Sequence, residues 1–230
     1  RPGPVLVDIP LNIQRTNVNL AMIESFSKDS GVANELDGET IKQIVKDIKS
    51  SSRPVVLVGG GVRLAKAQDV LFEFIQRTRI PVVSSLMGLD AFPHNDSSFV
   101  GMIGTYGNRY ANLTIANSDL VLALGTRLDT RQTGTRPETF VRRGMIIHVD
   151  IDSYELNNKI KAEFPINSDV KEFLVMLNNN ISEYDDSKIE SWRQTIKCYK
   201  DLCLLELQDC HASSLIILRV PSCLYTAQYP

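Results

Sequence analysis

The stretch "VVLVGGGVRLAKA", residues 55–67, runs from an apolar segment through three glycines into a segment with helical spacing of apolar residues. Glycine permits positive φ and close backbone approach, and a following helix N-terminus favours an anion. The stretch therefore predicts either a phosphate-binding turn or a tight structural turn between a strand and a helix. Leu64 stands where the third glycine of G-x-G-x-x-G would be, so this stretch alone does not decide between them.

Similar apolar runs recur along the chain and are rich in valine and isoleucine, as in strands buried on both faces. They lie at residues 4–9, 53–58, 80–86, 119–125 and 144–151. Amphipathic segments separate them, with the i, i+3, i+4, i+7 spacing of helices. Their apolar stripes are Ile41, Ile44, Val45 and Ile48; Leu64, Ala67, Leu71, Phe74 and Ile75; and Val170, Phe173, Leu174 and Leu177. Because parallel strands need crossover connections, the alternation predicts an α/β fold, a parallel sheet with helices on both faces.

The composition is that of a globular protein, with 43% hydrophobic and 23% charged residues among 230. A formal net charge of −2 argues against a nucleic-acid or anionic-membrane partner. No apolar run is long enough to span a bilayer, and "RPGPVLVDIP" lacks the pattern of a signal peptide. We therefore expect a cytoplasmic protein without a membrane segment.

The chain divides into a regular body at residues 38–180 and two attachments. Residues 1–37 hold the first apolar run and a polar linker, and residues 181–230 hold a possible helix at 187–202 and an irregular tail. The four cysteines lie near the end of the chain and lack paired C-x-x-C spacing, so reduced thiols without zinc are expected. They are Cys198, Cys203, Cys210 and Cys223.

Ligands of a doubly wound sheet bind at the carboxyl ends of the strands, where this chain places several suggestive residues. "GTRLDTRQTG", residues 125–134, spaces Arg127, Asp129 and Arg131 two apart, as a solvated ion-pair set or as guanidinium groups for a pyrophosphate. Asp150 ends the next strand and suits a ribose hydroxyl, whereas Asp152 is expected to cap a helix starting near Ser153.

Two further glycine-containing loops follow the predicted strands. They are "SSLMGLDAF", residues 84–92, and "GMIGTYGNRYAN", residues 101–112, and their glycines equally suit ordinary loop turns. No nucleophile elbow, Cys-His pair or carboxylate dyad stands out, so no catalytic residue and no metal ligand is predicted. His94 and His148 are interpreted as ordinary surface and strand residues.

Five motifs occur in order along the chain: "GGGVRLA", "SSLMGLDAF", "GTYGNRYANL", "DLVLALGTRLDTRQTG" and "IIHVDID". Together they make residues 38–180 resemble a known domain. It is the central domain of thiamine-diphosphate-dependent enzymes of the acetolactate synthase (acetohydroxyacid synthase) type. The resemblance implies a Rossmann-like parallel sheet of about six strands, with helices on both faces, that holds FAD, ADP or nothing. "RPGPVLVDIPLNIQ" looks like the last strand of the family's pyrimidine-binding domain and its exit linker.

The resemblance also implies a set of nucleotide contacts. The diphosphate would lie near Gly59, Gly60 and Gly61, and near Gly125, Arg127 and Arg131 with Asp129 between the two arginines. The flavin and ribityl region would lie near Ser85, Leu86 and Met87 and near Gly104, Thr105, Tyr106 and Gly107. The adenosine would lie near Asp150, Ile151 and Asp169. Met87, Thr105 and Tyr106 depart from the family pattern of Gln and Met-His, so FAD and ADP both stay candidates.

The resembled enzymes join or cleave carbon–carbon bonds of 2-oxo acids such as pyruvate. They use thiamine diphosphate and Mg²⁺, which require an amino-terminal glutamate and a carboxyl-terminal Gly-Asp-Gly segment. This sequence holds neither, so we expect it to be inactive without the missing thiamine-binding domains and to form homo-oligomers in a full enzyme. The alternatives are a separate nucleotide-binding module and a structural oligomerisation module.

Overall fold

The computed structural model describes residues 4–19 and 36–209, and most of its regular elements lie after residue 36. The helices are α1 (Leu11–Gln14), α2 (Gly38–Ser50), α3 (Gly60–Leu64), α4 (Gln68–Thr78), α5 (Arg109–Asn117), α6 (Thr130–Thr133), α7 (Val170–Asn180) and α8 (Glu190–Asp209). The strands are β1 (Pro54–Val58), β2 (Val82–Ser84), β3 (Phe99–Met102), β4 (Leu120–Leu124), β5 (Met145–Asp150) and β6 (Phe164–Asn167). Short 3₁₀ turns are η2 (Leu86–Gly88), η3 (Pro137–Thr139) and η4 (Asp186–Ile189).

The six strands form one sheet in the order β3-β2-β1-β4-β5-β6, and every pair is parallel. All five side chains of β1 and of β4 are buried, as continuous apolar runs predict for central strands covered on both faces. The predicted Rossmann-like α/β fold is therefore confirmed. The order reverses direction between β1 and β4, which makes this the switch point of the sheet.

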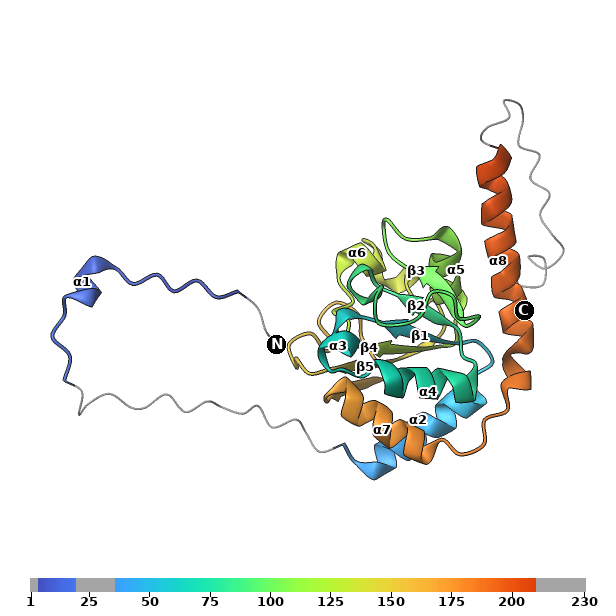
Figure 1. Cartoon of the computed structure of the whole chain (residues 1–230), viewed down its shortest axis with the longest axis horizontal. Coiled ribbons are helices and arrows are strands. Elements are labelled where there is room, and N and C mark those ends of the chain that lie inside the picture. Colours follow the sequence, from blue (N-terminus) through green and yellow to red (C-terminus); the bar gives the residue numbers. More distant parts are fainter. Residues whose placement is uncertain (1–3, 20–35, 210–230) are drawn as a thin grey trace.

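Helices cover both faces of the sheet (Figure 1). One layer contains α2, α4 and α7, of which α7 contacts both others, and the other contains α5 and α8. The predicted helical stripes supply much of the core: Ile41, Ile44 and Ile48 of α2 are fully buried, as are Phe74 of α4 and Phe173 of α7.

Three sequence predictions were wrong in the secondary structure. Residues 4–9 do not form a strand, and all of them are exposed, including Val5, Leu6 and Val7. The stripe from Leu64 to Ile75 belongs to two helices, because Lys66 adopts φ +52° between them and leaves Leu64 57% exposed. No helix begins near Ser153. The Asp152 carboxylate instead accepts a hydrogen bond from the Tyr154 N–H in a turn.

The helix α8 packs against α5 and extends past the predicted end at residue 202. Its Trp192 Nε1 donates to the Pro54 carbonyl at 3.2 Å, and its Lys200 Nζ donates to the Phe99 carbonyl of β3 at 2.9 Å. Neither Cys198 nor Cys203 of α8 is in a disulfide, while Cys210 and Cys223 lie outside the described residues. Among the described helices, none has the length and apolar character required to cross a membrane.

Glycines bring the turns after β1 and β4 into direct backbone contact. The Gly59 N–H donates to the Leu124 carbonyl, and the Gly61 N–H donates to the Gly125 carbonyl, both at 2.9 Å. A Cβ on Gly59 would lie 2.1 Å from the Gly125 oxygen, and one on Gly61 would lie 2.6 Å from the Gly125 Cα. Gly125 itself has φ +57°, a conformation that is strained for other residues. Backbone packing therefore requires glycine at Gly59, Gly61 and Gly125, whether or not a ligand binds.

We predict that Gly61→Ala lowers the free energy of unfolding by about 2–3 kcal/mol, because the new methyl group meets backbone that cannot move aside. Gly38→Ala is the matched control: no atom lies within 4 Å of its added Cβ, so it should raise stability by up to about 1 kcal/mol. Urea denaturation of both variants measures the difference. Equal effects of the two substitutions would contradict the packing role.

Candidate nucleotide-binding site

A cleft of about 470 Å³ lies at the carboxyl ends of the strands around the switch point. Its size falls within the usual range for small-molecule sites, and its location is where doubly wound sheets bind ligands. It is lined by Gly60, Gly61, Arg63, Leu64, Ala65, Ser85, Met87, Gly125, Thr126, Arg127, Asp129, Gln132, Asp150, Ile151, Asp169 and Val170. The turns after β1, β2, β4 and β5 and the start of α7 thus meet in one place.

The structure brings together some of the residues that the sequence suggested and leaves others outside. Those lining the cleft are Gly60, Gly61, Ser85, Met87, Gly125, Arg127, Asp129, Asp150, Ile151 and Asp169. Those not lining it are Gly59, Leu86, Gly104, Thr105, Tyr106, Gly107 and Arg131. Gly104 and Thr105 line a separate hollow of about 360 Å³, and the Tyr106 side chain is 84% exposed. The Thr105 N–H donates to the Arg131 carbonyl, which holds that loop against α6.

Six lining residues were missed from the sequence: Arg63, Leu64, Ala65, Thr126, Gln132 and Val170. Arg63, Gln132 and Val170 lie in the first turns of α3, α6 and α7, directly behind the turns that were singled out. Their position one turn into a helix after a strand end was the signal available for finding them.

The three glycines after β1 do not contribute equally to the cleft. The N–H groups of Gly59 and Gly61 are already bonded to the β4 turn, so neither can donate to a ligand. Gly60 lines the cleft and packs against the Met87 backbone, where a Cβ would lie 3.0 Å from the Met87 oxygen. The helix behind it, α3, is only five residues long and offers little dipole. Gly60 is therefore the glycine best placed to approach a ligand.

Arginine side chains supply the positive charge of the cleft. Arg127 follows β4, is 54% exposed, and lies 3.6 Å from Asp129 Oδ2. Asp129 also caps α6, accepting from the Arg131 and Gln132 N–H groups. On the rim, Arg63 pairs with Asp90 at 2.5 Å, and the hydrogen bond from Arg63 lowers the pKa of the Asp90 carboxyl. Both guanidinium groups can reorient toward a phosphate, because exposed ion pairs are weak.

Two further acidic side chains line the cleft, at the end of β5 and at the start of α7. Asp150 ends β5, is 4% exposed, and accepts from the Asp152 N–H at 3.0 Å. Asp169 caps α7 and accepts from the Lys171 N–H at 2.8 Å. The capping bond gives Asp169 a structural role that is independent of any ligand. These carboxylates suit hydroxyl groups of a ribose, which donate hydrogen bonds.

His148 is buried in β5 beneath the cleft. Its Nε2 donates to the Thr126 carbonyl at 2.6 Å, and within the described residues its Nδ1 has no hydrogen-bond partner. Burial lowers the pKa of His148; the Thr126 bond and the charges of Asp150 and Glu155 oppose this shift. A neutral ring therefore supports the Thr126 backbone at the turn after β4.

A doubly wound sheet with one cleft at its switch point defines the class of α/β proteins built like nucleotide-binding domains. The sequence matches the family described as "Thiamine pyrophosphate enzyme, central domain" over residues 41–177. The chain therefore belongs to the thiamine pyrophosphate enzymes, through their central domain. The resemblance seen in the sequence is thereby confirmed.

Curated relatives agree with this assignment. Acetolactate synthase 2, chloroplastic, of Nicotiana tabacum is 38% identical over 210 residues, covering 87% of this chain and 31% of that protein. The acetolactate synthase large subunit of Haemophilus influenzae is 36% identical over 209 residues, covering 87% of this chain and 36% of that protein. The chain thus spans about a third of the length of these relatives.

We predict that His148 makes the fold sensitive to acid. The unfolded chain takes up a proton as the pH falls through about 6.5, while the folded His148 stays neutral because its pKa is lowered. The free energy of unfolding should therefore fall below about pH 6.5, by up to about 1.4 kcal/mol per pH unit, until the folded pKa is reached.

The control is His148→Gln, whose amide N–H can donate to Thr126 without titrating. Urea denaturation at neutral and at mildly acidic pH should show a smaller loss for this variant than for the unmodified chain. The same loss in both proteins would show that His148 does not account for the acid sensitivity.

Proposed function

We propose that this chain serves as the central domain of a thiamine-diphosphate-dependent enzyme of the acetolactate synthase type, acting on 2-oxo acids such as pyruvate. Family membership and the two acetolactate synthase relatives support the proposal. Its catalytic groups would come from the two thiamine-binding domains of a full enzyme, which would assemble as a homo-oligomer. The chain alone is expected to be inactive.

The cleft at the switch point would hold FAD or ADP. The observation that carries this proposal is that Gly60 follows β1, Arg127 follows β4 and Asp150 ends β5, and that all three line one cleft. Arg127 and the Gly60 N–H suit a diphosphate, and the Asp150 carboxylate suits ribose hydroxyls. When bound, FAD would supply a redox-active ring, and the chain's residues would hold its diphosphate and sugar.

The chain's own residues do not fit thiamine diphosphate and Mg²⁺. The sequence contains no Gly-Asp-Gly segment. Across residues 4–19 and 36–209, no three His, Cys, Asp or Glu side chains are grouped so that they could hold a metal ion. Both cofactors would therefore bind to the other domains.

The expected location in the cytoplasm stays a prediction.

Calorimetric titration of the purified chain with FAD and with ADP tests the cleft. We predict that Arg127→Ala weakens binding by about 1–3 kcal/mol, or about 5- to 150-fold, because a charge-assisted hydrogen bond to phosphate is lost. Arg143→Ala is the matched control, since Arg143 is exposed and does not line the cleft. It should bind like the unmodified chain.

Two outcomes would contradict this proposal. Equal affinity of Arg127→Ala and the unmodified chain would remove the diphosphate role of Arg127. Dissociation constants above about 1 mM for both nucleotides, which correspond to less than about 4 kcal/mol, would leave the chain as a structural oligomerisation module.

A further inference from the structure

A second cleft, of about 460 Å³, lies at the opposite end of the sheet from the nucleotide cleft. It lies between α8, the turn from α4 into β2, and the segment before β3. Its lining residues are Arg79, Pro81, Ser97, Ser98, Val100, Asp186, Glu190, Arg193, Gln194, Ile196, Lys197 and Lys200. Four of these side chains are cationic and two are anionic, and neither the fold nor the proposed function uses this cleft.

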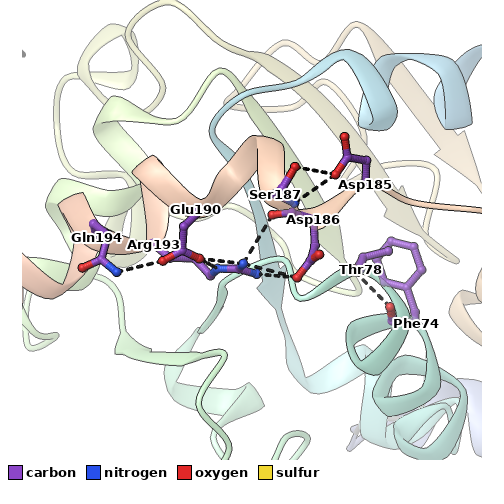
Figure 2. Close-up of polar contacts among 8 residues, drawn as sticks. All are labelled: Phe74, Thr78, Asp185, Asp186, Ser187, Glu190, Arg193 and Gln194. Carbon is purple, nitrogen blue, oxygen red and sulfur yellow. Dashed lines mark hydrogen bonds and ion pairs between the residues drawn. The ribbon is translucent and has the colours of Figure 1, made fainter.

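The two carboxylates of the second cleft are both taken up by one arginine (Figure 2). Arg193 Nη1 lies 3.2 Å from Asp186 Oδ2, and Arg193 Nη2 lies 2.7 Å from Glu190 Oε2. Gln194 Nε2 donates to the other oxygen of Glu190 at 2.8 Å. This network engages both carboxylates of the cleft and leaves its remaining cations without a carboxylate partner there, so the cleft as a whole carries a net positive charge.

Three cations remain: Arg79, Lys197 and Lys200. Within the part of the chain that the structure describes, none of them has a carboxylate within salt-bridge distance. Arg79 and Lys197 are exposed at the cleft, and Lys200 is half-buried with its Nζ bonded to the Phe99 carbonyl. The hydroxyl-bearing Ser97 and Ser98 face the same space.

Two features show that this cluster is costly to the isolated fold. Arg79 ends α4 with φ +55°, where glycine is the favoured residue and a side chain costs about 1 kcal/mol. Burial lowers the pKa of Lys200, which means that its ammonium group is poorly solvated. An anion in the cleft would offset the second cost and would engage the guanidinium of Arg79.

We propose that this second cleft binds a small phosphate-bearing anion through Arg79, Lys197 and Lys200. Three cations within one hollow of this size match a di- or triphosphate group of a small metabolite rather than a nucleic acid, whose binding surface would extend over a larger basic face. Arginine supplies a fork for two phosphate oxygens, and lysine supplies a point charge. The site shares no lining residue with the nucleotide cleft.

The test titrates inorganic pyrophosphate, and citrate as a polycarboxylate of similar charge, into the chain at constant ionic strength. All proteins carry Arg127→Ala, so that the nucleotide cleft contributes little to the signal. Arg79→Gly and Lys197→Ala are each expected to weaken pyrophosphate binding by about tenfold or more. Lys188→Ala, an exposed position of η4 outside the cleft, is the matched control and should leave binding unchanged.

Arg79→Gly keeps the test decisive, because glycine relieves the positive φ and the variant should unfold at the same or higher urea concentration than its parent. Loss of binding in a variant that is at least as stable supports a direct contact. Three results would overturn the proposal: no pyrophosphate binding, equal loss in Lys188→Ala, or citrate binding as tight as pyrophosphate binding.

Discussion

The backbone contact between the turns after β1 and β4 is the constraint on which the site depends. Gly61 and Gly125 lie so close that no side chain fits at either position, and two hydrogen bonds join the turns. The contact brings the ends of two central strands together and fixes the floor of the candidate nucleotide-binding cleft. A glycine turn that looks built for phosphate is thus first a packing device, and only Gly60 is left to approach a ligand.

The sequence patterns predicted the central strands, because burial on both faces leaves an unbroken apolar run. They also predicted the long helices, because burial of one face leaves an apolar stripe. The edge strands β3 and β6 were missed, since Gly101 and Pro165 interrupt their short runs and their burial is partial. The division between α3 and α4 was not predicted, because lysine rarely adopts the left-handed conformation that Lys66 has between them.

The same reasoning located the cleft but not all of its lining. Residues at or just after strand ends, such as Asp150 and Arg127, can be located in the sequence. Because the carboxyl ends of parallel strands lie at one edge of the sheet, the topology brings these residues together in the cleft. Whether Leu86 or Tyr106 faces the cleft depends on loop conformation, which periodicity does not determine. Arg63 and Gln132 came into the cleft through short helices whose direction the sequence did not indicate.

The hydrogen bond from α8 to the edge strand β3 bears on whether copies of the molecule can pair with one another. An edge strand offers unpaired carbonyl and amide groups that invite another chain to add a strand. Lys200 of α8 donates to the Phe99 carbonyl of the edge strand β3, so this acceptor is not available to an incoming strand. A chain cleaved by a protease ahead of Glu190 would lose α8 and this hydrogen bond. Copies of such a chain would be expected to pair through their β3 edges and form insoluble β-rich material.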